Sequence, residues 1–447
     1  MKKIQKILLL VLMLAFVILL SSCRSKEDVS LTDAKINESG ELVLHYSDGK
    51  EQNLGVVVGK DGTDGKDGAD GKDGETVSSE SIVINGEDSE ASLASAKALR
   101  SSVSIVSNFQ TSVYQGGWYP GGGQTTTRDY TASGSGVIYK MDKAEGDAFI
   151  ITNYHVVYDA SSNTENGISN NIDVYLYGSE IEEKAIDATY VGGSLYYDIA
   201  VLRVENSEIL KESSACEVSV FDSNNVVVGD SAIAIGNAQG YGVSVSLGIV
   251  SVDSEYITMI SADGKTEVSF RVMRVDAAVN SGNSGGGLFN GNGDLIGIVN
   301  AKIVYDGVEN IGYAIPSKVA VSIAENIIDY CYGTDEERVQ RALLGITVSA
   351  TDSKAVYDTE TGKIKIEETV SVYEVAEGSL AKGMLQTGDV LLSATLNGET
   401  VDISRQYHVI DMMLDVRAGD TITFSVLRND EEKTITIVIT EECLTEY

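Results

Sequence analysis

Residues 103–315 form a succession of short apolar runs separated by Gly, Asn and Asp, among them "GSGVIY", "AFIITN", "IAVLRV", "SAIAIGN" and "FRVMRV". Many short strands with close-set turns predict an all-β barrel or sandwich. After Pro316, "SKVAVSIAENIIDYCYG" keeps apolar residues at helical spacing until Gly333, and this predicted helix closes the domain. A second β-rich unit follows, with one predicted helix at 404–416. The predicted fold class is therefore mainly β.

The first 22 residues carry a targeting pattern. Lys2, Lys3 and Lys6 precede the apolar run "ILLLVLMLAFVILL" (7–20), which is short for a spanning helix but typical of a secretory signal. The run ends in "LSSC", which resembles the lipobox of bacterial lipoproteins, where cleavage before the cysteine leaves it lipidated. We therefore expect Cys23 to anchor the mature protein at the extracytoplasmic face of a bacterial cell membrane. A plain signal peptide is the alternative.

Three short segments follow this signal. Residues 23–58 contain two apolar runs around Asp48 and Gly49, which predict a small hairpin. Residues 59–74 carry Gly at every third position, with Asp before each following Gly. This Gly-x-Asp stretch predicts a flexible charged spacer, or a short collagen-like triple helix if three chains meet. Residues 75–91 are expected to be a linker.

Charge and cysteine usage exclude several classes of function. The chain has 67 acidic and 33 basic residues and a net charge of −34, so nucleic acid would be repelled. Beyond Cys23 three cysteines remain, and their odd number leaves at least one thiol unpaired in the monomer. Whether Cys216 and Cys331 pair stays open. No Cys or His spacing indicates a metal site, and nothing indicates an organic cofactor.

Three residues of the first β-rich region could form one catalytic site. His155 lies in "FIITNYHVV", Asp198 in "YYDIAVLRV" and Ser284 in "VNSGNSGGGLFN". Each has an ordinary structural interpretation, as a lone histidine or as a turn residue. Together they stand in the His, Asp, Ser order of chymotrypsin. A neighbouring imidazole that a carboxylate orients can activate a serine hydroxyl, and the flanking glycines allow the backbone to bend.

The segments around these residues resemble the HtrA family of trypsin-like serine proteases. "TNYHVV", "YDIAVL", "DAAVNSGNSGGGLFNGNGDLIGI" and "IGYAIPS" are similar to family motifs and occur in the family order. The resemblance covers about 92–440. It implies a chymotrypsin-like double β-barrel protease domain at 92–333 and a PDZ domain at 341–440.

The resemblance also implies the roles of the site residues. His155 would be the general base, Asp198 the residue that orients it, and Ser284 the nucleophile. The backbone amides of Gly282 and Ser284 would form the oxyanion hole.

A substrate pocket can be placed in the same way. The residue six before the nucleophile is Ala278, and in chymotrypsin-fold proteases this position lies at the base of the S1 pocket. Because Ala278 offers no carboxylate to a substrate Lys or Arg, we expect a small or medium apolar P1 residue. Asn300, Ala301 and Lys302 are expected to form the pocket wall.

The last unit resembles a PDZ domain. "LLGITV" is similar to the carboxylate-binding loop, so Leu344, Gly345 and Ile346 are expected to receive a peptide C-terminus. "GSLAKGMLQTGD" is one residue shorter than the usual segment and lacks its proline. A unit that serves only as a packing lid is the alternative.

Residues 110–133 are expected to form a Gly-rich loop that carries Trp118, the only tryptophan, and Tyr119. The family has a regulatory loop here, so both aromatic residues could contact a neighbouring subunit. Exposed aromatic residues in an irregular loop are the alternative.

The resemblance as a whole predicts a membrane-tethered serine endopeptidase of protein quality control. Its substrates would be unfolded or damaged exported proteins, and its assembly a homotrimer. The alternative is a surface binding or holdase protein that keeps the protease fold but cleaves little.

Overall fold

The computed structural model describes residues 31–36, 41–47, 49–56, 90–115, 124–164, 166–179, 182–240, 242–300, 311–334, 339–359 and 361–446. The chain divides into two compact units, Met1–Val83 and Ile84–Tyr447. The targeting segment with Cys23, the Gly-x-Asp spacer, and the pair Trp118 and Tyr119 lie outside the described residues. No helix within the described ranges is long and apolar enough to cross a membrane.

The first unit contains a small antiparallel sheet. Its order is β1-β2-β3, formed by β1 (Leu31–Ile36), β2 (Glu41–Tyr46) and β3 (Glu51–Val56). The predicted hairpin is β2 and β3, and Gly49 takes φ +80° in the turn between them. The prediction missed β1, whose pattern is interrupted by Asp33 and Lys35.

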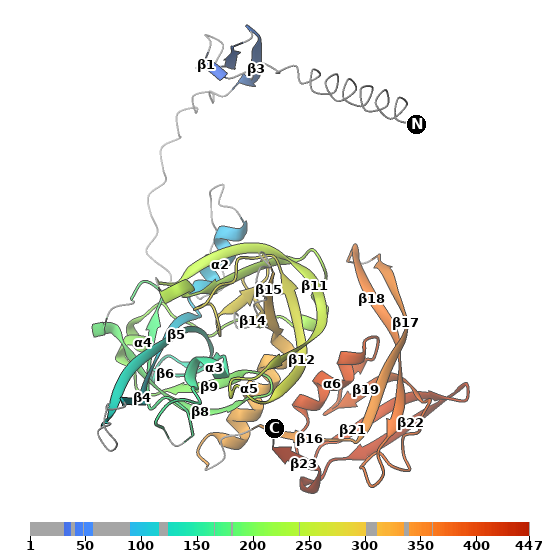
Figure 1. Ribbon diagram of the computed structural model, residues 1–447. Helices are drawn as coiled ribbons and strands as arrows, with labels where there is room; N and C mark the ends of the chain where they lie inside the picture. The colour runs from blue at the N-terminus through green and yellow to red at the C-terminus, as the bar shows by residue number, and fades with distance from the viewer. Residues whose placement is uncertain are drawn as a thin grey trace, which may run out of the picture. The chain divides into compact units, whose positions relative to one another are not determined.

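The second unit begins with helix α2 (Glu90–Leu99) and a closed six-stranded barrel, the first barrel (Figure 1). The strand order is β4-β5-β6-β9-β8-β7. Strand β7 alternates buried and half-exposed side chains, as one buried face requires, whereas β9 is buried almost throughout. The elements are β4 (Ser102–Gln115), β5 (Gln124–Asp142), β6 (Asp147–Thr152), α3 (Tyr154–Val157), β7 (Asn171–Leu176), η1 (Glu182–Lys184), β8 (Ile186–Ser194), β9 (Ile199–Val204) and α4 (Glu208–Glu212).

A second closed barrel follows, in the order β10-β11-β12-β15-β14-β13. Helix α5 (Ser317–Cys331) then packs Val319, Ile323 and Ile327 into a core shared with residues of both barrels, which explains why its apolar residues recur at helical spacing. The other elements are η2 (Ser223–Asn225), β10 (Ser231–Gly236), η3 (Ala238–Gly240), β11 (Ser244–Ile260), β12 (Glu267–Val275), β13 (Gly287–Phe289), β14 (Leu295–Val299) and β15 (Gly312–Pro316).

The C-terminal part has its own sheet and core. The sheet order is β17-β18-β19-β21-β22, β20 pairs with β19, and β16 and β23 form a separate pair. The predicted helix is α6 (Gln406–Asp415). The strands and the last short helix are β16 (Gln340–Ala342), β17 (Ile346–Asp358), β18 (Lys363–Val375), β19 (Val390–Leu396), β20 (Glu399–Asp402), β21 (Thr421–Arg428), β22 (Glu431–Val438), η4 (Glu441–Cys443) and β23 (Leu444–Glu446).

Helix α6 also contacts the second barrel. Arg271 of β12 and Asp411 of α6 form an ion pair whose side chains are 2% and 3% exposed. The Arg271 guanidinium lies 4.0 Å from the centroid of the Tyr407 ring. At the end of the helix, Asp415 pairs with Lys318 of α5 at 2.6 Å. These contacts tie the C-terminal sheet to the barrels within the second unit.

The predicted loop at 110–133 is wrong in its extent. Strand β4 continues to Gln115 and β5 begins at Gln124, and the two pair antiparallel along this length. Thr125, Thr126 and Thr127 have the β-branched side chains that favour such pairing. The two strands therefore form a long hairpin.

Candidate active site

His155, Asp198 and Ser284 come from three separate segments that meet in the fold. His155 lies in α3, directly after β6, and Asp198 directly precedes β9. Ser284 lies between β12 and β13. The first barrel thus supplies two of the side chains and the second barrel supplies the third.

The imidazole of His155 links the other two side chains. Its Nε2 lies 2.8 Å from Oγ of Ser284, and its Nδ1 lies 2.6 Å from Oδ2 of Asp198. The backbone N–H of His155 also donates to Oδ1 of Asp198 at 2.9 Å. The carboxylate therefore fixes the ring with one nitrogen toward the serine hydroxyl. In this arrangement an imidazole can accept the hydroxyl proton.

Two buried amide side chains hold Asp198, which has the left-handed φ of 56° that is uncommon outside glycine. Nδ2 of Asn153 donates to the Asp198 carbonyl at 2.8 Å, and Nδ2 of Asn300 donates to Oδ2 of Asp198 at 2.9 Å. The sequence analysis placed Asn300 in a pocket wall and gave Asn153 no role. Asn153 stands in "TNYHVV", so the motif that pointed to His155 was also the signal for Asn153.

The turn before Ser284 requires glycine. Gly282 has φ +95°, and a Cβ there would stand 2.1 Å from the carbonyl oxygen of Asn237. The N–H of Gln239 donates to the carbonyl of Ser281 at 2.7 Å, which fixes the peptide group whose N–H belongs to Gly282. Gly285, on the other side of the nucleophile, has φ +81°. A residue with a side chain at 282 would displace this turn.

The predicted substrate pocket is described only in part. Ala278 is exposed, and its carbonyl accepts a hydrogen bond from the Ser246 hydroxyl at 2.8 Å. The side-chain amide of Asn300 is directed to Asp198, and Ala301 and Lys302 lie outside the described residues. The preference for a small or medium apolar P1 residue therefore stays a prediction.

The predicted peptide-binding loop precedes an edge strand. Gly345 has φ +70°, and its carbonyl accepts from the N–H of Ala376 at 2.8 Å. Ile346 begins β17, which lies at the edge of its sheet. The Gln406 side chain of α6 donates to the Val348 carbonyl at 2.8 Å, so the helix lies beside this edge. An edge strand beside a helix is the setting in which PDZ domains add a peptide as a further strand.

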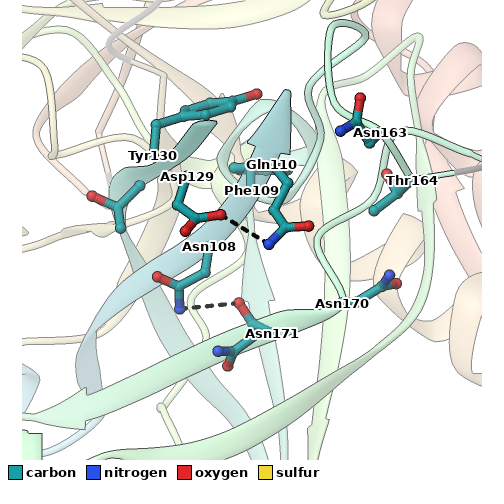
Figure 2. A pocket seen from close by; sticks show the side chains of 10 residues that line it. Asn108, Phe109, Gln110, Asp129, Tyr130, Asn163, Thr164, Asn170 and Asn171 are labelled. Atoms are coloured by element: carbon teal, nitrogen blue, oxygen red, sulfur yellow. Dashed lines mark hydrogen bonds between the residues drawn. The ribbon is translucent and has the colours of Figure 1, made fainter. Parts of the chain in front are cut away.

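A separate cavity of about 810 Å³ lies between the β4–β5 hairpin and the segment before β7 (Figure 2). The Gln110 side chain donates to Asp129 at 2.8 Å, and Asn108 donates to the Asn171 carbonyl at 3.4 Å. The lining contains none of the predicted site residues, so this cavity is not the predicted substrate pocket. The lining residues are Asn108, Phe109, Gln110, Asp129, Tyr130, Thr131, Asn163, Thr164, Asn170 and Asn171.

Cys216 is a free thiol, so it forms no disulfide with Cys331. Across the part of the chain that the structure describes, no group of three or more His, Cys, Asp or Glu side chains is placed to hold a metal ion.

Comparison with known proteins identifies both halves of the second unit. Residues 134–298 match the family model of a trypsin-like peptidase domain, and 342–439 match that of a PDZ domain. The chain is 35% identical over 314 residues to "Serine protease Do-like HtrA" of Bacillus subtilis (strain 168), which covers 68% of this chain and 62% of the relative. It is 32% identical over 344 residues to "Serine protease Do-like HtrB" of the same organism, covering 75% of this chain and 68% of the relative.

Among solved structures, "HtrA-type protease AlgW with decapeptide" is 24% identical, with a TM-score of 0.47, and the match covers 80% of this chain and 98% of that chain. The chain spans only 62% of the length of the Bacillus HtrA. The two family models and the Bacillus relatives confirm the family resemblance and the predicted mainly β fold class, whereas the lipoprotein form stays a prediction. The chain belongs to the HtrA family of serine proteases, with a trypsin-like peptidase domain followed by a PDZ domain.

Proposed function

We propose that this chain is a membrane-tethered, extracytoplasmic serine endopeptidase that cleaves unfolded or damaged exported proteins. The observation that carries the proposal is the hydrogen-bonded series from Ser284 through His155 to Asp198, with distances of 2.8 and 2.6 Å. These distances support an acyl-enzyme mechanism.

In this mechanism Oγ of Ser284 attacks the scissile carbonyl while Nε2 of His155 takes the hydroxyl proton. Asp198 holds the other ring nitrogen and stabilises the imidazolium. The N–H groups of Gly282 and Ser284 stabilise the negative oxygen of the tetrahedral intermediate. His155 then returns the proton to the leaving amine, and the acyl group remains on Ser284. Water, activated by the same histidine, hydrolyses the ester and restores the serine.

Two further sites would select substrates. The pocket at Ala278, Asn300, Ala301 and Lys302 would take a small or medium apolar P1 side chain, because Ala278 provides no negative charge for Lys or Arg. In the PDZ domain the backbone amides of the loop Leu344–Ile346 would bind the carboxylate of a peptide C-terminus, and β17 would pair with the peptide. Profiling of cleavage products from denatured casein tests the first site, and dominant cleavage after Lys or Arg would contradict it.

The N-terminal part would place the protease at the membrane. Lipidation of Cys23 would anchor the chain, and the Gly-x-Asp spacer would hold the catalytic part away from the surface. The family resemblance supports a homotrimer, in which three spacers would come together.

Proteolysis of unfolded β-casein by the purified protein tests the function, with Ser284→Ala as the matched control. We expect cleavage by the parent and a rate lower by roughly 10⁴–10⁶ in the variant, as is typical when a triad member is removed. His155→Ala should cost about as much, and the double variant should cost little more, because the two side chains act as one unit. If neither protein cleaves, even with apolar C-terminal peptides added, the holdase interpretation gains support.

A further inference from the structure

Ser135 of β5 lies in the first barrel and is 1% exposed, yet its bonds lead to the catalytic turns. Its N–H donates to the carbonyl of Ser284 at 2.8 Å. Its carbonyl accepts the hydroxyl of Thr152 at 2.7 Å, one residue before the Asn153 that holds Asp198. The backbone of Ser135 is therefore bonded to the nucleophile residue and to the strand that leads to His155.

The hydroxyl of Ser135 joins two further segments. It donates to the carbonyl of Gly282 at 2.7 Å and accepts the N–H of Asn237 at 2.8 Å. A serine hydroxyl has one donor and two acceptor positions, so one group can make both bonds. Asn237 lies two residues before Gln239, whose N–H holds the Ser281 carbonyl at 2.7 Å.

These bonds fix both peptide groups that flank Gly282. The peptide before it carries the Ser281 carbonyl, which Gln239 holds, and the peptide after it carries the Gly282 carbonyl, which Ser135 holds. Glycine rotates more freely about φ and ψ than any other residue. Without external partners its peptide groups could turn, and the Gly282 N–H would leave the position that an oxyanion requires.

The packing leaves little space around the Ser135 side chain. A Cβ added to Gly236 would stand 2.9 Å from its Oγ, and one added to Gly286 would stand 3.1 Å from its Cβ. A Cβ added to Gly285 would stand 2.3 Å from the Ser135 carbonyl oxygen. The glycines around the nucleophile thus also allow β5 to approach the turn.

We propose that Ser135 is a positioning residue of the protease site, whose hydroxyl holds the Gly282 carbonyl and thereby helps to keep the adjacent Gly282 N–H in the orientation of an oxyanion hole. The inference rests on the proposed function of Ser284 and adds a residue of the other barrel to it. A buried hydroxyl with a purely structural role could form its hydrogen bonds with any polar group nearby. All four Ser135 contacts instead involve the catalytic turns or the segments beside them.

Ser135→Ala tests this role against Ser322→Ala, which removes an equally buried hydroxyl that donates to the Lys318 carbonyl in α5 at 2.6 Å. We expect kcat/KM of Ser135→Ala on a chromogenic apolar peptide to fall by about 10- to 100-fold, less than for loss of an oxyanion donor itself. The loss should fall on kcat, because the hole acts on the transition state. Affinity for a peptide boronic acid, which forms a tetrahedral adduct, should fall in parallel. Ser135→Cys keeps the volume with a weaker donor and should lie between.

Amide hydrogen exchange of residues 280–286 reports on the hydrogen bond between Ser135 and Gly282 without requiring catalysis. Faster exchange of this segment is expected in Ser135→Ala than in the parent or in Ser322→Ala, which also loses a buried hydroxyl hydrogen bond and so controls for a general loss of stability. If the parent proves inactive, the proposed function fails, and exchange alone then decides the role of Ser135. Parent-like kcat/KM or parent-like exchange in Ser135→Ala would overturn the inference, as would losses in Ser322→Ala of the same size.

Discussion

The side-chain amide of Asn300 donates a 2.9 Å hydrogen bond to Oδ2 of Asp198, the same oxygen that lies 2.6 Å from Nδ1 of His155. Asn300 follows β14 of the second barrel, whereas the other two residues belong to the first. The carboxylate that orients the histidine is therefore itself oriented from the opposite barrel.

Removal of this amide should slow catalysis more than it weakens substrate binding. Hydrogen bonds to charged groups contribute about 1.5–3 kcal/mol, so Asn300→Ala should lower kcat/KM by about 10- to 100-fold. Asn300→Asp should lower it further, because it places a second carboxylate beside Asp198. Steady-state kinetics on a peptide substrate measure both. Asn326→Ala in α5, which removes a buried amide that donates to the Gln340 carbonyl, is the control. Full activity of Asn300→Ala would show that the contact has no catalytic role.

A methyl group at Gly282 should disable the site without unfolding the protein. In Gly282→Ala the added Cβ would stand 2.1 Å from the Asn237 carbonyl oxygen, so the turn must move. We expect a loss of at least about 10²-fold in kcat, the usual effect of losing one oxyanion donor. Gly178→Ala is the matched control: it has φ +74° but no atom within 4 Å of an added Cβ. It should cost roughly 1 kcal/mol of stability and no activity. Equal activities of the two variants would be the contrary result.

Asp389 should stabilise the C-terminal sheet in a pH-dependent way. Its side chain is 1% exposed and accepts two 2.7 Å hydrogen bonds from Arg428. Burial pushes the pKa of Asp389 upward, but the Arg428 bonds and the N–H of Gln386 outweigh burial and hold that pKa below its usual range. A carboxyl whose folded-state pKa is depressed stabilises the fold above its unfolded pKa of about 3.9, and the contribution is lost as the pH falls through the folded-state value.

Asp389→Asn should therefore lower the free energy of unfolding by about 1–3 kcal/mol at pH 7, and the difference from the parent should shrink below about pH 4. Thermal unfolding followed between pH 7 and pH 3 measures this. Glu377→Gln, which breaks an exposed pair with Lys382, should have almost no effect. A difference that stays constant across this pH range would contradict the ion-pair explanation.

The buried pair between Arg271 and Asp411 should cost more to break than to replace. Asp411→Ala would leave the Arg271 charge buried without its carboxylate, which typically costs about 3–5 kcal/mol. The double variant Arg271→Met with Asp411→Leu removes both charges and should recover most of that loss. Urea unfolding of the single and double variants tests the prediction. A double variant as unstable as Asp411→Ala would show that packing, and not the unpaired charge, causes the loss.

Local motifs predicted which residues meet at the site. His155, Asp198 and Ser284 each stand beside a strand in a distinctive sequence, and the structure brings all three within hydrogen-bond distance. The glycine requirement at 282 followed from the bend that the turn needs. Such features depend on a few neighbouring residues, so the sequence displays them directly.

Local motifs could not predict the direction of the Asn300 amide or the contacts of Ser135. Both depend on how closely the two barrels approach, which is a relation between distant segments. The family resemblance placed Asn300 in the wall of the substrate pocket but could not decide which way its side chain turns. Ser135 lies in "GSGVIY", which predicted a strand and gave no sign of what its hydroxyl bonds.

The predicted strand boundaries were wrong for a related reason. The glycines in 110–133 predicted a loop, but cross-strand pairing extends β4 and β5 well into this segment. Likewise, β1 has a weak apolar pattern. It forms by pairing with β2, and the local sequence does not show which strands pair. Tertiary pairing overrode local preference in both cases.

Because His155 and Asp198 come from the first barrel and Ser284 from the second, the order of synthesis separates them. A nascent chain emerges N-terminus first, and domains tend to fold as they appear. An exported chain of which only the first barrel has emerged and folded would hold a base without a nucleophile. The proposed proteolysis therefore requires the second barrel to close against the first, so a copy with only its first barrel folded would cleave no protein.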